Sequence, residues 1–413
     1  MSGIMERRNS RENVDGKTLK LVYARTLSTA FSSGLSAPFF GLFEARLGAS
    51  PAELGAFHSM LNLFSNIAQL LWGYLSDKFM RKKLIVFLST LTSSLIFILI
   101  LSSKTPLDFI AYASLQAIIA SAGQPAWLAL VGNLAPPSYV GTLASTLNLW
   151  NEVGVLASTF AAGVLAEFSA DGLGEFTLPF LLALAFGILA SLLVIPIPEV
   201  RVKSGNFHLG FKFVLKDIAH NEAFLKFIAV STAYGIFMSL AWPMFTYVVA
   251  NELGLELFEI AILNVGQGIV RTLTQIYAGR LIDHYGRKPF IAYGRILLTF
   301  FTLVYAFFPD FTIILAVSMF LSIPVALLNT AILAYLIDVT PPEVRGSYTA
   351  VYNLSIGLAF SIGSMVGGIF AQLLSVFLGE SEAVKLVLIA SGVGRFIFGI
   401  LHFKISESRR MNE

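Results

Sequence analysis

The chain has 413 residues, of which 56% are hydrophobic and only 13% are charged, and its mean hydropathy is +0.76. A soluble domain cannot bury that much apolar surface in one core, so the composition excludes an ordinary soluble protein and predicts a membrane protein. The net charge is only +3, and there is no cysteine, which excludes disulfides and thiolate metal sites.

Long apolar segments follow one another along the whole chain. Because about 20 apolar residues cross a bilayer, we predict twelve spans, at about 20–43, 54–74, 84–102, 109–132, 141–166, 177–196, 224–249, 259–280, 290–308, 311–337, 346–374 and 384–403. We expect residues 1–19 to form a cytosolic tail, 20–197 a six-helix bundle, 198–222 a cytosolic connecting loop, 223–404 a second six-helix bundle and 405–413 a C-terminal cytosolic tail.

Lysine and arginine are distributed unequally between the two sides that these spans define. One side, which includes both termini and the connecting loop, collects twenty of them, against only Arg46, Lys104 and Lys385 on the other. Positive residues accumulate in short loops on the cytoplasmic side. The sequence therefore predicts a multi-pass protein of the cytoplasmic membrane with both termini in the cytosol.

The two halves of the chain repeat each other. A charged turn at 73–83, between the second and third spans, returns at 279–289, and Gly73, Asp77 and Arg81 are matched 206 positions later by Gly279, Asp283 and Arg287. An offset that is kept across six spans indicates a duplicated six-helix unit, and because six is even, both copies face the same way. We predict an all-helical membrane protein of two pseudo-symmetric six-helix bundles.

The second charged turn, Gly279 to Lys288, resembles the loop signature of the major facilitator superfamily, G-x-L-x-D-x-x-G-R-K, at every defining position. The first turn, Gly73 to Lys82, is similar except that Met80 stands where the signature has Gly. Together with the spans and the repeat, the resemblance covers essentially the whole chain. It implies the major facilitator fold and a secondary transporter that works by alternating access.

The resemblance also implies that the two charged turns are conformational latches, in which Asp77 caps the eleventh helix and Asp283 the fifth. The residues of these latches are Gly73, Asp77, Arg81, Gly279, Asp283, Gly286 and Arg287. The alternative is that the turns are ordinary basic anchors at the inner leaflet. Two copies in register favour the latches.

Polar side chains recur along single helical faces of several spans, at spacings of three and four residues. Polar groups inside a span are costly, and in the family geometry these helices flank the seam between the bundles. We therefore expect them to line a solute cavity, with contacts between helices as the alternative. The predicted lining residues are Asn62, Asn148, Asn151, Glu152, Tyr234, Trp242, Asn264, Gln267, Arg271 and Asn353.

Two charges lie near the middle of the bilayer. Glu152 is 11 residues from Gly141 and 15 from Glu167, and Arg271 is 12 residues from both Glu259 and Asp283. We hypothesise that Glu152 and Arg271 form an ion pair across the seam or share a substrate. Protonation of Glu152 or binding of the solute would then break the pair and release the alternating motion.

We find no metal-ligand cluster, nucleophile triad or phosphate loop, and we expect no enzyme activity, metal, cofactor or nucleic-acid partner. The leading expectation is a monomer in the lipid bilayer that exports amphipathic, drug-like compounds in exchange for protons. The fourth span, however, lacks the arginine that proton-coupled drug antiporters of the superfamily carry. The alternatives are uptake or facilitated passage of a small organic anion, and a transport-inactive receptor or scaffold.

Overall fold

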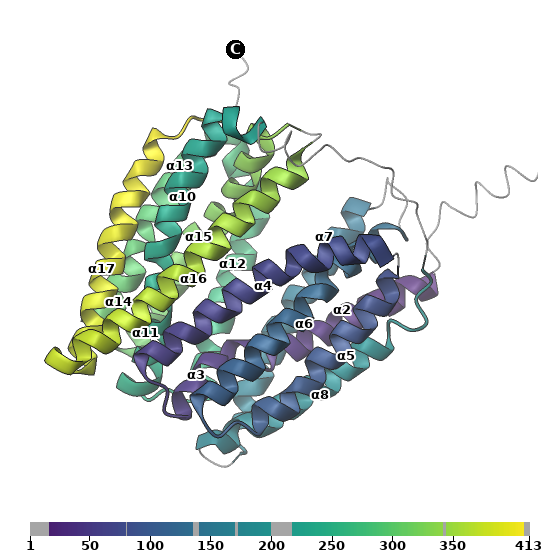
Figure 1. The fold of residues 1–413 in the computed structure, drawn as a ribbon, viewed down its shortest axis with the longest axis horizontal. Helices are drawn as coiled ribbons and strands as arrows, with labels where there is room; N and C mark the ends of the chain where they lie inside the picture. Colours follow the sequence, from purple (N-terminus) through teal and green to yellow (C-terminus); the bar gives the residue numbers. More distant parts are fainter. Residues whose placement is uncertain are drawn as a thin grey trace, which may run out of the picture. The chain divides into compact units, whose positions relative to one another are not determined.

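The structure is a computed structural model, and it describes residues 16–79, 81–134, 140–169, 172–199, 217–341 and 344–408. Within these ranges, the side chains of residues 70, 71, 73–79 and 140 are not described. The described residues form helices and connecting turns and contain no strand (Figure 1). The all-helical class predicted from the sequence is confirmed.

The N-terminal half contains seven helices and two short 3-10 turns in the described ranges. They are α2 (Gly16–Gly34), η1 (Ala37–Phe39), α3 (Phe40–Arg46), α4 (Pro51–Phe79), α5 (Lys82–Leu101), α6 (Pro106–Gly132), α7 (Val140–Ala166), η2 (Gly172–Phe176) and α8 (Thr177–Leu192). Thr105 starts α6 with a capping box, in which its hydroxyl accepts from the Asp108 amide and the Asp108 carboxylate accepts from the Thr105 amide.

The C-terminal half continues the same pattern. Its described elements are α10 (Glu222–Leu240), α11 (Trp242–Tyr247), the π-helical turn η3 (Val248–Glu252), α12 (Leu257–Tyr285), α13 (Lys288–Leu297), α14 (Thr299–Phe307), α15 (Phe311–Val339), α16 (Arg345–Leu378), α17 (Glu380–Leu401) and η4 (His402–Lys404). Asn221 caps α10 by accepting from the Phe224 amide at 3.0 Å.

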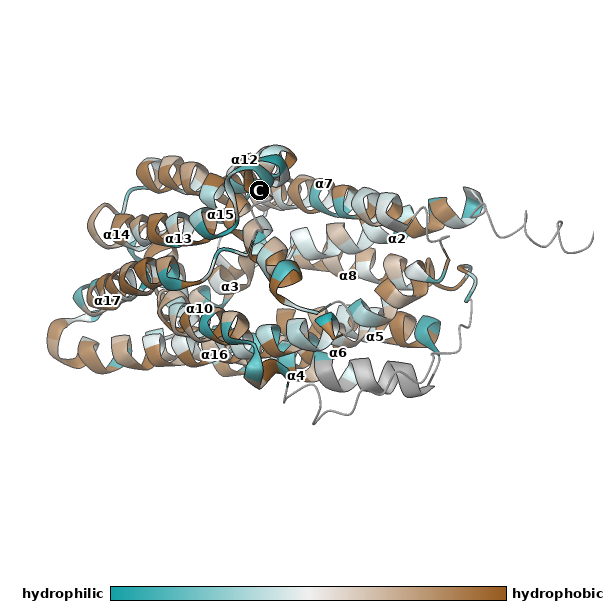
Figure 2. Cartoon of the chain, turned by 90° about the horizontal axis from the view of Figure 1, so that it is seen from above, coloured by the Kyte–Doolittle hydropathy of each residue, from teal (hydrophilic) through white to brown (hydrophobic). Residues whose placement is uncertain are grey.

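Nine helical segments of the described chain are long and apolar enough to cross a membrane. They are Lys82–Leu101, Pro106–Gly132, Gly141–Ala166, Gly172–Leu192, Glu222–Glu252, Lys288–Phe307, Phe311–Val339, Arg345–Leu378 and Glu380–Lys404. The other three predicted spans correspond to α2 with α3, to α4 and to α12, which carry more polar side chains. In Figure 2, α14 and α17 are largely brown, whereas teal residues interrupt α12.

The duplication predicted from the residues is also visible in the helix boundaries. Helices α4 and α12 both have 29 residues, and both ends are 206 positions apart (257 − 51 and 285 − 79). Helices α2 and α10 both have 19 residues and keep the same spacing (222 − 16 and 240 − 34). The halves differ where α5 is continuous and its counterpart is broken into α13 and α14 at Leu298.

By its internal contacts, the chain divides into two compact units, residues 1–40 with 64–206 and residues 41–63 with 207–413. In the first unit, α5 packs on α6 and α8, and α2 packs on α7 and α8. In the second, α10 packs on α16 and α17, and α12 packs on α15. Residues 41–63 belong to the first half by the sequence repeat but pack with helices of the second half.

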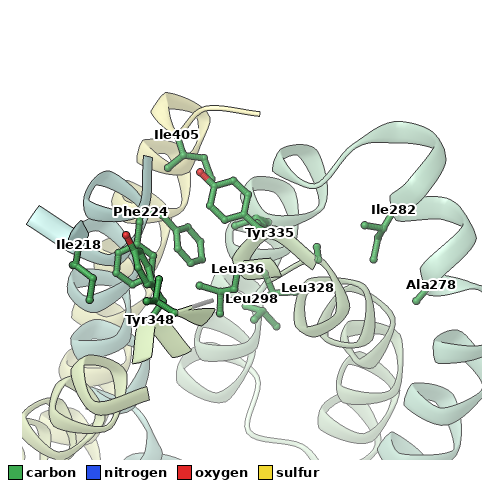
Figure 3. Packing of buried hydrophobic residues seen from close by; sticks show 14 residues of the cluster. Ile218, Phe224, Ala278, Ile282, Leu298, Leu328, Tyr335, Leu336, Tyr348 and Ile405 are labelled. Atoms are coloured by element: carbon green, nitrogen blue, oxygen red, sulfur yellow. The ribbon is translucent and has the colours of Figure 1, made fainter. Parts of the chain in front are cut away.

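The core of the second unit is a cluster of aromatic and aliphatic side chains drawn from its helices (Figure 3). The rings of Phe224 and Tyr348 meet edge to face at 4.6 Å, and the Tyr348 hydroxyl donates to Asp217 at 2.7 Å. Ile405 is also buried in this core, near Tyr335. The chain therefore still packs just beyond residue 404, where we expected the bundle to end.

Candidate functional site

Helix α7 has one packed face and one open face. Its packed face lies against α2: the Thr159 hydroxyl donates to the Gly34 carbonyl at 3.0 Å, and a Cβ on Gly154 would lie 2.7 Å from that of Ala30. Asn148 and Asn151 are exposed and Glu152 is half-exposed. The predicted cavity residues of α7 therefore lie away from its packing partner.

Helix α12 divides its side chains in the same way. Its buried face includes Leu263 and Gly268, whereas Asn264 is exposed and Gln267 and Arg271 are half-exposed. The Asn264 side-chain amide donates back to the Ile260 carbonyl at 2.9 Å and keeps its oxygen available. Asn353 of α16 is exposed as well.

The two mid-span charges, Glu152 and Arg271, form no ion pair with the described residues of their own units. Among the described residues of its unit, Glu152 has no ion-pair partner, and Arg271 likewise has none in the described part of the second unit. A charge deep in a membrane is costly without a partner, water or a ligand. The pairing of Glu152 with Arg271 stays a prediction.

Tyr234 does not line a cavity, and our expectation for it was wrong. Its side chain is only 2% exposed, its hydroxyl donates to the Arg295 carbonyl at 3.1 Å, and its ring faces the Arg295 guanidinium at 4.7 Å. The Arg295 guanidinium also contacts Nε2 of His402, whose Nδ1 lies 2.6 Å from the Phe398 carbonyl. Tyr234 is thus part of a buried polar cluster inside the second unit.

Arg395, on α17, is buried and contacts the backbone of two other helical segments. It is 2% exposed, and its guanidinium donates to the carbonyls of Leu298 at 3.1 Å and Met238 at 2.6 Å. Leu298 separates α13 from α14, and Met238 lies next to the break between α10 and α11. Arg395 therefore ties together two places where helices are interrupted.

The first half of α4 packs closely on α16, and we call the residues that touch there the α4–α16 contact: Gly55, Ser59, Ser361 and Gly368. A Cβ on Gly55 would lie 2.7 Å from the Ser364 carbonyl oxygen and 2.8 Å from the Cα of Gly368. The hydroxyls of Ser59 and Ser361 are 2.8 Å apart. Only glycine at positions 55 and 368 allows this approach.

His58 and Trp242 lie beside the α4–α16 contact. Nε2 of His58 is 3.4 Å from the Thr246 hydroxyl, and its ring is 6.3 Å from that of Trp242, which in turn packs on Phe360 at 4.7 Å. His58 therefore lies in a contact between helices. The Asn62 amide on the next turn donates to the His58 carbonyl at 2.7 Å.

Sequence reasoning missed Glu44, on the short helix α3. Its side chain is fully buried at 0% exposure, and neither carboxylate oxygen has a hydrogen-bond partner among the described residues. Burial, with a smaller contribution from the charge of Glu53, raises the pKa of Glu44 well above its usual value. No sequence pattern predicts this burial, because Glu44 falls just after the first predicted span.

The second charged turn is fully described. Gly286 adopts a φ of +90°, which favours glycine, and a Cβ there would lie 2.7 Å from Oε2 of Glu407. The Glu407 carboxylate accepts from the amides of Arg287 at 3.0 Å and Lys288 at 3.1 Å, at the start of α13. The sequence had placed Glu407 in the tail and gave it no role.

Side chains within the second turn are paired locally. Arg287 makes ion pairs of 3.0 Å with Asp338 on α15 and with Asp283 one turn earlier on α12. The Asp283 side chain is 72% exposed, and a Cβ added to Gly279 would meet nothing within 4 Å. The expected capping of the fifth helix by Asp283 stays a prediction.

In the first charged turn, side chains are described only from Arg81 onward. The side chains of Gly73 and Asp77, and Met80 itself, lie outside the description. Arg81 is exposed at the start of α5, where the Glu199 carboxylate accepts from the Lys83 amide at 3.1 Å. Arg81, Lys83 and Glu199 border a cavity of about 300 Å³ with Leu84, Phe87 and Ile195.

The repeated helices and charged turns are found together in a known protein family. The sequence model of the Major Facilitator Superfamily matches residues 25–241 and 227–412, which is almost the whole chain. The chain belongs to the major facilitator superfamily. The resemblance that we drew from the charged turns is therefore confirmed.

Relatives within the superfamily match to different extents. An uncharacterised MFS-type transporter of Methanocaldococcus jannaschii is 22% identical over 367 residues, 88% of this chain and 91% of that protein. Another from the same organism is 32% identical over 127 residues, so that the match spans only 33% of its length. The cis,cis-muconate transport protein of Acinetobacter baylyi is 23% identical over 421 residues, 95% of each chain.

Solved structures of superfamily members share the fold. The nucleoside transporter NupG superposes with a TM-score of 0.77 at 12% identity, covering 94% of this chain and 100% of that one. The D-xylose-proton symporter superposes with a TM-score of 0.68 at 16% identity, covering 95% and 98%. The predicted major facilitator fold is confirmed. This facilitator is a multi-pass membrane protein and a transporter of small solutes, not an enzyme.

Proposed function

We propose that this facilitator exports small amphipathic organic compounds by alternating access, in exchange for protons carried by Glu152. The observation that carries the proposal is that Glu152 and Arg271 each lie at mid-span on a face turned away from its packed neighbour, with no ion-pair partner among the described residues of its own unit. Such charges are retained in membrane helices where they meet a solute, an ion or each other.

The surroundings of Glu152 favour an amphipathic solute. Leu149, Trp150 and Val153 are exposed on α7 beside it, so this helix presents apolar side chains next to one carboxylate. An aromatic ring and aliphatic groups bind the apolar part of a solute, and the carboxylate exchanges a proton when the solute enters or leaves.

We propose that the α4–α16 contact is the external gate of this transporter. With both termini in the cytosol of a cell bounded by this membrane, the turn between α3 and α4 faces outward. Residues 41–63 come from the first sequence repeat but pack on the second unit, so their contact joins the two repeats on the outer side. The protein works as a monomer, with Asp77 and Asp283 latching the cytosolic side.

A second candidate function is uptake of a small organic anion. It is favoured by Arg271, which would meet a carboxylate if Glu152 did not neutralise it, and by the likeness over 95% of the chain to a cis,cis-muconate transport protein. A transport-inactive scaffold is disfavoured, because a scaffold has little reason to keep two costly mid-span charges.

Flux into liposomes that contain the purified protein tests these functions. When a pH gradient is imposed, we expect a lipophilic cation dye to cross the membrane in the direction opposite to the protons. We expect a dicarboxylate not to cross. Dicarboxylate flux that Arg271→Gln abolishes would replace export by anion uptake, and flux independent of the gradient would remove proton exchange. No flux of either solute in either direction would favour the scaffold.

Exchange of the two charges tests their pairing. Glu152→Arg and Arg271→Glu alone should each lower transport roughly tenfold or more, because each leaves two like charges in the membrane. The double exchange should recover a large part of the activity. The matched control exchanges Glu167 and Arg280, at the exposed ends of the same helices, and should change transport little. A double exchange no better than either single one would overturn direct pairing.

A further inference from the structure

We propose that Glu44 is a proton-binding site that controls the α4–α16 contact, which forms when Glu44 is protonated and opens when Glu44 gives its proton to external water. This inference rests on the proposed function, because it takes the α4–α16 contact to be the external gate. It adds a second titratable site, at the gate, to the mid-span carboxylate that we assign to exchange.

The burial of Glu44 is the first argument. The side chain is fully enclosed, both of its oxygens lack a hydrogen-bond partner in the described chain, and only residues 47–50 separate α3 from α4. An ionised carboxylate without partners is very costly in a dry site, whereas the neutral acid is tolerated. The closed arrangement therefore holds Glu44 as the carboxylic acid.

The position of α3 links Glu44 to the gate. A Cβ on Gly41, one turn before Glu44, would lie 3.0 Å from the Thr246 side chain, and Thr246 contacts His58 on α4. On the other side of Glu44, the Arg46 guanidinium donates to the Leu255 carbonyl at 3.3 Å. Movement of α3 and the first half of α4 away from Thr246 and Leu255 would break these contacts and expose Glu44 to water.

Neither oxygen of the Glu44 carboxylate has a hydrogen-bond partner in the described chain, although charged and titratable groups lie on nearby elements. They are Arg46 on α3, Glu53 and His58 on α4, Tyr247 on α11, Glu252 on η3, and Glu256 and Glu259 at the start of α12. Arg46 is directed to a carbonyl, and Tyr247 donates to Glu380 at 2.7 Å. The remaining groups are mostly acids, which disfavour a further negative charge.

The carboxylate of Glu53, unlike that of Glu44, has hydrogen-bond donors in the described chain. It accepts from the amide and the hydroxyl of Ser50, both at 2.8 Å, at the start of α4. The charge of the Glu53 carboxylate favours the neutral form of Glu44. Glu53 thus has hydrogen-bond donors for its carboxylate, whereas Glu44 has none among the described residues.

Opening of the gate releases one proton. Opening transfers the proton from the Glu44 carboxylic acid to a water molecule, leaving a carboxylate and a hydronium ion, and closing reverses the step. Because the closed form binds one proton more than the open form, low external pH favours the closed gate and high pH favours opening. A single proton changes this equilibrium by at most about tenfold per pH unit.

Spin labels on the two sides of the gate measure this equilibrium directly. The chain has no cysteine, so Ala52→Cys on α4 and Phe377→Cys on α16 provide two unique labelling sites in the full-length protein in lipid nanodiscs. Double electron–electron resonance is then recorded between pH 5 and 9. We expect the short, closed distance to dominate at low pH and to be replaced by a longer one as the pH rises.

Three variants assign the response to Glu44. Glu44→Gln should stay closed at every pH, because the amide cannot ionise. Glu53→Gln should move the midpoint of the distance change to lower pH, because it removes the neighbouring negative charge. This variant tests the proposal even if Glu44→Gln does not fold. Glu175→Gln, the same change at a buried acid of the first unit, and His58→Gln should both respond like the parent.

The proposal is overturned if Glu44→Gln keeps the parent's pH response, if Glu53→Gln leaves the midpoint in place, or if His58→Gln abolishes the response. It is also overturned if the parent shows one distance at every pH while liposomes transport solute, in which case the proposed function stands. Conversely, a pH-dependent distance in a protein that transports no solute would refute the proposed function and leave the proton site at Glu44.

Discussion

The two charged turns of this facilitator carry nearly the same residues, yet in each turn backbone amides donate to a carboxylate that lies outside the signature. In the first turn, the Glu199 carboxylate accepts from the Lys83 amide at the start of α5. In the second, the Glu407 carboxylate accepts from the Arg287 and Lys288 amides at the start of α13. The second turn has two such bonds and a glycine that lets Glu407 approach. The signature residues therefore form only part of each turn, and the carboxylate that caps the following helix comes from more than 100 residues away.

The largest expected effect separates the two glycines of the second turn. Gly286→Ala should lower the free energy of unfolding by about 1–2 kcal/mol, because its φ is positive and a Cβ would press on Glu407. Gly279→Ala should raise it by about 0.5–1 kcal/mol, because Gly279 is helical with nothing near its Cβ position. Thermal unfolding in detergent measures both, and equal shifts would contradict the role of Gly286.

A smaller effect compares the two caps. Glu407→Gln should cost about 1 kcal/mol and Glu199→Gln less, because Glu407 accepts from two amides and Glu199 from one. Hydrogen exchange should accelerate at the start of α13 in the first variant and at the start of α5 in the second. A greater loss from Glu199→Gln would reverse the ranking of the two turns.

The smallest effect lies within the ion pairs of Arg287. Asp283→Asn should cost about 0.3 kcal/mol, because its side chain is 72% exposed, and Asp338→Asn, at 26% exposure, somewhat more. Both losses should shrink in high salt. If Asp283→Asn lowers transport while its stability stays near that of the parent, the latch gains support; unchanged transport would count against it.

The sequence was most informative where a pattern repeats along the chain. The paired turns and the succession of apolar spans predicted the duplicated helical fold, whereas the polar lining of a solute cavity stays a prediction. The sequence was least informative where a side chain meets a distant segment. Tyr234 looks like a cavity aromatic until Arg295 and His402 enclose it, and nothing near Glu44 in the sequence reveals that it is buried. Such contacts depend on the arrangement of helices, which local periodicity does not encode.

Arg395 also constrains how the protein is made. Its guanidinium donates to the carbonyls of Leu298 and Met238, beside interruptions in two earlier helices, but it lies on α17, which leaves the ribosome after both of them. Until α17 inserts, these two carbonyls lack that donor inside the membrane, where each unmet polar group is costly. The second unit therefore completes its packing only after α17 has been synthesised, and truncation before residue 395 should leave a chain that the cell's quality-control proteases recognise.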